Sequence, residues 1–292
     1  MYTLPETRFD FAGDEYIFAE ISRDMSPLSH FKALAITNEL TRRQIPGILE
    51  ICPSNASYLV RFNPDLIPAR ELLDDLKEID LTKSNPLELH LSSRIVEIPT
   101  WYDDPKTREY SRRFKNKHHH PELTDFDYVV KINGYRDKKS FIEAHSSLPY
   151  LITMMGFMPG AGWQFPLGSE KERTIQAPKY LSPRTDTPER AVGLGGGFTF
   201  LYPVAGPGSY QLIGRSAVPT VRVSPNPPDI FFLARPGDLW KYRSIDEKEY
   251  MRIQEEVALG TYTYKQKDIE FSVGDYLKME RSYIEALLEG FS

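Results

Sequence analysis

Residues 154–168 read MMGFMPGAGWQFPLG and combine four glycines with methionine, proline and aromatic side chains, without a charge among them. Glycine adopts positive φ at no steric cost and lets the backbone come close to a ligand. Main-chain N–H groups placed in this way donate well to ligand oxygens, and an apolar wall strengthens such bonds. The stretch therefore predicts a ligand-binding turn, and a tight β-barrel corner packed by aromatic rings is the alternative. The residues that would contact the ligand are Gly156, Phe157, Met158, Pro159, Gly160 and Trp163.

The segments around this stretch, from Pro149 onward, are rich in β-forming residues separated by glycine and proline. Many short strands between such turns are typical of a β-barrel or a β-sandwich. GLGGG at 193–197 resembles a phosphate-binding loop only weakly, because no Gly-Lys-Ser/Thr follows it, and we expect a turn at a strand edge. A helix at 247–257, a strand near 260–264 and a terminal helix over 275–288 are expected to follow.

The N-terminal third alternates between strand and helix patterns. Period-two and period-3.6 hydrophobic spacing predict the elements in the order strand, helix, strand, strand, helix at 16–22, 27–44, 47–52, 57–62 and 68–79. This order predicts a small antiparallel sheet with both helices on one face. Residues 82–86 are a plausible hinge, after which strand patterning resumes. We therefore expect a small α+β domain over 1–90 and a mostly β domain over 91–292.

The segment 103–124 is polar and lacks apolar periodicity, and it contains three consecutive histidines, His118, His119 and His120. Adjacent loop residues rarely place three imidazoles on one ion, and no cysteine or carboxylate spacing completes a metal-ligand set. A solvated surface insertion is the preferred interpretation, with no metal bound.

The composition argues against several classes of protein. The net charge is −5, from 36 basic and 41 acidic residues without a block of like charge, so no basic surface for nucleic acid is expected. The longest apolar stretch, around 148–158, is too short and interrupted to span a bilayer, and no signal peptide is predicted. The single cysteine, Cys52, suits a reducing cytosol and is expected to be a small core residue. We therefore expect a cytoplasmic protein without a membrane partner.

Several motifs, taken in order, carry a resemblance to a known family. HSSLPYLITMMGFMPGAGW, APKYLSPR, GPGSYQLIGRS and ARPGDLWKY follow one another between residues 145 and 242. QIPGILEICPSNASYLVRFNP and SPNPPD add two weaker matches at 44–64 and 224–229. This set resembles the carboxyltransferase C–D subunit family, which includes allophanate hydrolase subunit 1, the B subunit of 5-oxoprolinase and a histidine-kinase inhibitor. The resemblance implies an α+β N-terminal domain joined to a cyclophilin-like β-barrel. Residues 103–124 and the tail beyond about 259 depart from the family pattern.

The resemblance also implies a function. Members of this family work with an A–B partner, similar to the C subunit of 5-oxoprolinase, on small amide, lactam or urea-like substrates. The complex would use ATP, or biotin carried on another chain, and a biotin carboxylase or carrier protein would then be a further partner. This chain has no nucleophile-elbow, Walker or biotin-attachment motif, so we expect it to be inactive alone. The alternative is a non-catalytic regulator of the kinase-inhibitor type.

The resemblance also implies site residues, which are assigned where this sequence matches a motif of the family. His145, Arg184 and Arg215 match family positions and would act as catalytic residues, whereas a core histidine and structural arginine ion pairs are the alternatives. Further substrate contacts implied by the family turns are Phe198, Gly206, Gly208, Tyr210 and Gln211. Phe198 stands where the family has a glutamine, and Lys179 replaces an arginine. An apolar ring in place of an amide changes which substrate groups the site can bind, so the substrate need not be 5-oxoproline or urea.

Overall fold

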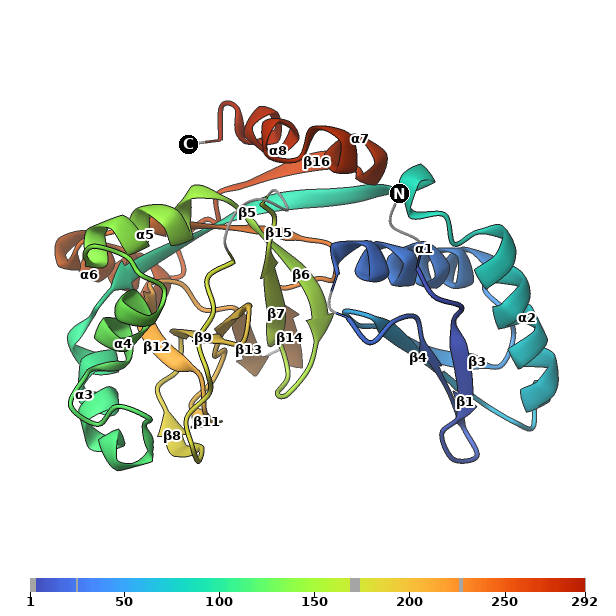
Figure 1. Ribbon diagram of the computed structural model, residues 1–292, viewed down its shortest axis with the longest axis horizontal. Coiled ribbons are helices and arrows are strands. Elements are labelled where there is room, and N and C mark those ends of the chain that lie inside the picture. The colour runs from blue at the N-terminus through green and yellow to red at the C-terminus, as the bar shows by residue number, and fades with distance from the viewer. Residues whose placement is uncertain (1–3, 25, 169–173, 226–227, 292) are drawn as a thin grey trace. The chain divides into compact units, whose positions relative to one another are not determined.

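The computed structural model describes residues 4–24, 26–168, 174–225 and 228–291, and these form two compact units (Figure 1). The first unit contains Met1–Ser92 and Glu270–Glu280, and the second contains Ser93–Ile269 and Arg281–Ser292. The sequence predicts the first boundary at residue 90, two positions from Ser92, but assigns the segment 270–280 to the second domain. Part of the SPNPPD motif, residues 226–227, lies outside the described residues.

The first unit is a four-stranded antiparallel sheet with helices on it. The strand order is β1-β2-β4-β3, and the bounds are β1 (Arg8–Phe11), β2 (Tyr16–Glu20), β3 (Ile48–Pro53) and β4 (Ser57–Phe62). Alternate residues of β2 and β4 are buried against the helices, as a half-covered sheet requires. The helices that share this core are α1 (Pro27–Arg43) and α2 (Ala69–Thr82). The predicted order and sheet are confirmed, except that β1 was not expected.

A C-terminal segment completes this unit. It contains α7 (Val273–Met279), which packs against the short 3-10 helix η1 (Pro86–Glu88). A Cβ added at Gly274 would lie 2.6 Å from the carbonyl oxygen of Leu87, so only glycine allows this approach. The ring of Phe31 on α1 lies 5.9 Å from that of Phe271 and 6.0 Å from that of Tyr276.

The second unit is built on a closed barrel. Seven strands follow one another in the order β12-β9-β10-β7-β6-β15-β5, and the pairing of β12 with β5 closes the ring. Neighbouring strands are antiparallel except for the parallel pair β15 and β5. The bounds are β5 (His90–Tyr102), β6 (Tyr150–Met155), β7 (Gly162–Pro166), β9 (Ala191–Gly195), β10 (Phe198–Leu201), β12 (Gln211–Ser216) and β15 (Leu239–Ser244). The predicted fold class, an α+β domain followed by a mostly β barrel, is confirmed.

Other elements surround the barrel. An eighth strand, β16 (Gln266–Ser272), extends the sheet beyond β5, and two hairpins pair β8 with β11 and β13 with β14. The hairpin strands are β8 (Arg184–Thr187), β11 (Gly206–Gly208), β13 (Val221–Pro225) and β14 (Pro228–Phe232). The helices are α3 (Pro105–Arg113), α4 (Asp125–Ile132), α5 (Lys138–Ser147), α6 (Glu247–Ala258) and α8 (Arg281–Leu288), with the 3-10 helix η2 (Lys115–Lys117) after α3.

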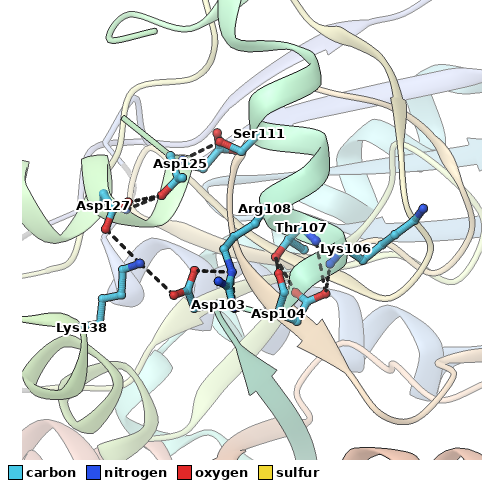
Figure 2. A network of polar contacts seen from close by, with 10 residues as sticks. Asp103, Asp104, Lys106, Thr107, Arg108, Ser111, Asp125, Asp127 and Lys138 are labelled. Atoms are coloured by element: carbon cyan, nitrogen blue, oxygen red, sulfur yellow. Dashed lines mark hydrogen bonds and ion pairs between the residues drawn. The ribbon is translucent and has the colours of Figure 1, made fainter. Parts of the chain in front are cut away.

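The segment 103–124 is not a solvated loop, so that prediction is wrong. It forms α3 and η2, and Tyr110 and Phe114 are each only 8% exposed in a core shared with the barrel strands. The Asp104 side chain accepts the N–H groups of Lys106 and Thr107 and so caps α3 (Figure 2). The pattern was missed because α3 is short and its buried face is polar and aromatic rather than aliphatic.

Polar contacts join α3 to α4 and α5. Lys138 at the start of α5 lies between the carboxylates of Asp103 and Asp127, at 2.8 and 2.9 Å (Figure 2). The hydroxyl of Ser111 on α3 accepts the backbone N–H of Asp125 at 2.8 Å. These bonds make the segment a fixed part of the second unit.

Three smaller predictions are also wrong. Cys52 is exposed, because its side chain lies on the opposite face of β3 from the helices. Partial burial of the thiol and the charge of Glu50 raise the pKa of Cys52. Residues 260–264 are not a strand, and the described strand begins at Gln266. The expected terminal helix is two helices, separated at Glu280, where φ is 47°.

Candidate functional site

The turn between β6 and β7 carries the stretch on which the ligand prediction rests. The Gly156 N–H donates to the Ala161 carbonyl and the Ala161 N–H to the Met158 carbonyl, both at 3.1 Å. Gly160 has φ 76°, as the sequence suggests, but so does a residue with a large side chain: Phe157 has φ 71°. Positive φ is uncommon outside glycine and strains a bulky residue. The ring of Phe157 is nevertheless 62% exposed, and Pro159 beside it is exposed as well.

An aromatic cluster lies beside this turn, and we define it as Phe157, Trp163, Phe198, Phe200 and Tyr210. The Trp163 ring lies 5.8 Å from Phe198, 5.5 Å from Phe200 and 5.8 Å from Tyr210, each time edge to face. Phe157 meets Phe200 edge to face at 6.0 Å. This geometry is the favoured one for aromatic pairs and fixes the rings. The structure thus brings together five rings from β7, β10, the turn and the residue directly before β12.

Glycines make room for these rings. A Cβ at Gly195 would lie 2.7 Å from the Cγ atom of Tyr210, and one at Gly208 would lie 2.8 Å from the Thr187 hydroxyl. Gly206 is opposite Met158, whose Cε would be 3.6 Å from an added Cβ. Met158 packs on the same core, so Gly206 and Met158 border the aromatic cluster, whereas Gly208 serves the packing of β11 on β8.

Two polar groups stand out in this apolar setting. Among the described residues, the indole N–H of Trp163 has no hydrogen-bond partner, although it is shielded from solvent. A Cβ at Gly156 would lie 3.8 Å from that nitrogen, so the missing side chain keeps the space next to the donor open. Lys179 is exposed, and its ammonium lies 5.6 Å from the centre of the Tyr210 ring. The cluster can therefore offer a donor to a carbonyl oxygen and one positive charge.

Gln211 does not face this cluster with a free amide. It is fully buried, its oxygen lies 2.8 Å from Nε2 of His118, and its NH₂ group donates to the Pro178 carbonyl at 2.9 Å. His118 is 4% exposed and contacts the rings of Tyr128 and Tyr180. The position of Gln211 favours a structural role, and the first histidine of the HHH run is its partner.

Arg184 is also inside the protein. Its side chain is 0% exposed, Nη1 donates to the Tyr210 carbonyl at 2.9 Å, and the carboxylate of Asp125 lies 3.6 Å away. The guanidinium stacks on Tyr180 at 4.6 Å, and the Tyr180 hydroxyl donates to Asp125. Leu212 donates its N–H to the same carboxylate at 2.8 Å. These contacts favour the structural ion pair over a direct substrate contact.

His145 lies inside the barrel, 1% exposed, among the rings of Phe141, Tyr150 and Tyr242. Nδ1 is 2.8 Å from the Tyr102 hydroxyl and Nε2 is 3.1 Å from the Thr199 hydroxyl. Burial, with the nearby charge of Lys241, lowers its pKa to about 3. A ring that stays neutral at physiological pH does not shuttle protons there, so the structure favours the core alternative.

Arg215 lies in a different environment from Arg184 and His145. It is half-buried on β12, and its guanidinium lies 5.4 Å from the centre of the Tyr250 ring on α6. Tyr250 belongs to another apolar cluster than the rings around Trp163. The three arginine and histidine positions that the family pattern suggests are therefore not brought together at the aromatic cluster.

Sequence reasoning missed Phe200, a member of the aromatic cluster, and the adjoining ring of Tyr202. Phe200 and Tyr202 meet at 4.9 Å, and the Phe200 ring is central to the cluster. The alternation of Phe198 and Phe200 around Thr199 on one strand was the available signal, because period-two residues share a face.

In the described part of the chain, no group of three or more His, Cys, Asp or Glu side chains has a metal-binding arrangement. No helix among the described residues is long and apolar enough to cross a membrane.

Comparison with known proteins gives a consistent result. Residues 7–231 match the family described as carboxyltransferase domain, subdomain C and D. The chain is 30% identical over 247 residues to the B subunit of 5-oxoprolinase from Bacillus subtilis, covering 81% of this chain and 90% of that protein. It is 24% identical to urea amidolyase of Lachancea kluyveri, covering 98% of this chain but 16% of that protein. The crystal structure of Kluyveromyces lactis urea carboxylase superposes with a TM-score of 0.80 at 23% identity, over 98% of this chain and 26% of that one.

Proposed function

Because this chain belongs to the carboxyltransferase family of subdomains C and D, we propose that it acts as the C–D subunit with an A–B partner on a small amide, lactam or urea-like substrate. The relatives, the B subunit of 5-oxoprolinase and urea amidolyase, support a component of an enzyme. They do not favour the alternative of a kinase inhibitor. We also propose a cytoplasmic location, which the lone cysteine supports.

The observation that carries the proposal is the free indole N–H of Trp163 among the rings of the aromatic cluster. A shielded donor without a partner costs free energy unless a ligand accepts from it. An amide, lactam or urea supplies a neutral carbonyl oxygen and a flat surface for stacking against rings. The Gly156 backbone leaves room for that oxygen, and Lys179 would meet an anionic group on the same molecule.

The aromatic cluster supplies binding and orientation rather than acid–base chemistry. The titratable groups that sequence reasoning assigned to catalysis, His145 and Arg184, are buried and engaged with protein atoms. We therefore propose that they support the strands of the site and that the reacting groups come from the A–B partner. ATP, or biotin on another chain, would be used by the complex, and this chain would be inactive alone.

The proposal is tested by mixing the purified chain with a matching A–B partner and measuring turnover of 5-oxoproline with ATP, and of urea with ATP, bicarbonate and a biotin carboxylase with its biotin carrier protein. We expect a stable complex that is active and a free chain that is not. Trp163→Phe keeps a ring but removes the N–H, and loss of one such bond should raise KM or lower kcat/KM about tenfold.

A matched pair of exposed phenylalanines provides the control. Phe157 is 62% exposed and Phe11, in the first unit, is 53% exposed. Phe157→Ala should reduce kcat/KM, whereas Phe11→Ala should not. Turnover by the free chain, or equal effects of the two alanine variants, would contradict the proposal.

A further inference from the structure

Arg215 differs from the other buried and half-buried arginines of its unit in having no carboxylate at ion-pair distance among the described residues. Arg94, Arg184, Arg190 and Arg243 have carboxylate oxygens at 2.8, 3.6, 3.1 and 2.9 Å respectively. Within the described part of the chain, no carboxylate lies within ion-pair distance of Arg215, and its Nε has no hydrogen-bond partner. A half-buried charge without a partner is costly, and one aromatic face offsets only part of that cost.

A second unused donor lies at the same place. Tyr250 on α6 is 4% exposed, its ring stacks under the Arg215 guanidinium, and its hydroxyl also has no partner among the described residues. Buried hydroxyl groups in proteins are normally hydrogen-bonded, so an orphan beside an unpaired arginine requires an explanation. Two donors, one from the barrel and one from α6, are thus left without a partner in the described part of the chain, and the guanidinium carbon of the first lies 5.4 Å from the ring centre of the second.

The nearby acceptors are already in use. Asp104 is close enough for the Arg215 charge to affect its pKa, which burial raises, but its carboxylate accepts the Thr107 hydroxyl and the N–H groups that cap α3. Arg190, whose charge also reaches Tyr250, is bound to Gln254 at 2.8 Å and to Glu189 at 3.1 Å. The local surplus is therefore of hydrogen-bond donors.

We propose that Arg215 and Tyr250 form a binding site for a small oxyanion, a carboxylate, bicarbonate or phosphate. A planar guanidinium offers two parallel N–H groups to two oxygens of such an anion, and the tyrosine hydroxyl adds a third donor. The site is distinct from the aromatic cluster, because Tyr250 packs in another apolar cluster. Arg215 lies within residues 7–231, the part that matches the family, but Tyr250 lies outside it, so the family match does not supply the pairing of these two residues.

Binding at Arg215 requires neither the A–B partner nor a substrate at Trp163, so the free full-length chain suffices for the test and its outcome is independent of the proposed function. Calorimetric titrations with phosphate, bicarbonate and acetate, at constant ionic strength set with chloride, should show one saturable site for at least one oxyanion. Comparing the three anions identifies the class. Absence of saturable binding of all three at millimolar concentration would overturn the proposal.

Two variants test the residues. Tyr250→Phe deletes an unsatisfied hydroxyl, so it should leave the melting temperature unchanged or slightly raised but weaken anion binding about tenfold. Arg215→Lys keeps the charge, loses the two-pronged donor and should weaken binding about tenfold or more. Arg222→Lys is the control, because Arg222 also stacks on a ring, that of Phe231 at 4.8 Å, but on the β13–β14 hairpin. Unchanged affinity in Tyr250→Phe and Arg215→Lys, or an equal loss in Arg222→Lys, would refute the assignment.

Discussion

Replacing Asp125 by asparagine should destabilise the second unit strongly, although the two side chains have nearly the same shape. Asp125 is 1% exposed and is the carboxylate nearest to the fully buried Arg184, at 3.6 Å. It also accepts the Leu212 N–H at 2.8 Å and the Tyr180 hydroxyl. Asparagine retains an acceptor oxygen but not the charge, so Arg184 would remain as an uncompensated cation in the interior.

The expected magnitude follows from that burial. Breaking a buried pair by removing one partner costs about 3–5 kcal/mol, far more than the pair contributes relative to apolar residues of the same size. For a unit of this size, that corresponds to a decrease in melting temperature of roughly 6–20 °C. The double variant Asp125→Asn/Arg184→Met removes both charges and should recover most of the loss.

The measurement is thermal unfolding of the wild type, Asp125→Asn, Arg184→Met and the double variant, with hydrogen exchange of the Leu212 amide as a local probe. Asp127→Asn is the matched control on the same helix: its side chain is 41% exposed and faces Lys138, so it should cost at most about 1 kcal/mol. The reasoning is refuted if Asp125→Asn is no more destabilising than Asp127→Asn. It is also refuted if the double variant loses as much as the two single changes added together.

Three further outcomes are expected. Deleting residues 106–121 should abolish folding of the barrel unit, measured by circular dichroism and soluble yield, because α3 and η2 contribute buried rings; a folded deletion variant would contradict the packing. Gly160→Ala should cost about 2–4 kcal/mol, seen by urea unfolding, since φ is 76° and the new Cβ would be 2.8 Å from Phe232. Because burial holds the pKa of His145 near 3, below its unfolded value of about 6.5, protons bind preferentially to the unfolded chain in acid. Stability should be greatest above about pH 6.5 and fall between there and about pH 3, and His145→Phe should flatten that slope; an unchanged slope would exclude the buried neutral ring.

The sequence was most informative where the local pattern and the tertiary environment agree. The helices at 27–43 and 69–82 and the strands at 48–53 and 57–62 have regular apolar spacing, and the structure has them where they were expected. The composition of the glycine-rich turn at 154–168 also marks it as unusual. Positive φ at Gly160 follows from its chemistry, but positive φ at Phe157 does not, because a bulky side chain disfavours it.

Side-chain roles were harder to predict, because they depend on which face of an element a residue occupies. Cys52 and Ile51 are neighbours on one strand, yet only the face that carries Ile51 packs against the helices. His145 and Arg184 occupy positions that suggest catalysis, and only their partners in distant strands show that they are buried. The segment 103–124 looked solvated because charged residues outnumber its few buried rings.

The return of residues 270–280 to the first unit has a consequence for how the chain folds during synthesis. N-terminal domains usually fold first, as soon as they leave the ribosome. Here Phe31 meets Phe271 and Tyr276, partners that are made some 240 residues later. The first unit can collapse early, but α7 cannot cover this part of its core until translation is nearly finished. Its last step is therefore expected to be post-translational, and a chain truncated before residue 270 should show the first unit with faster hydrogen exchange in α1.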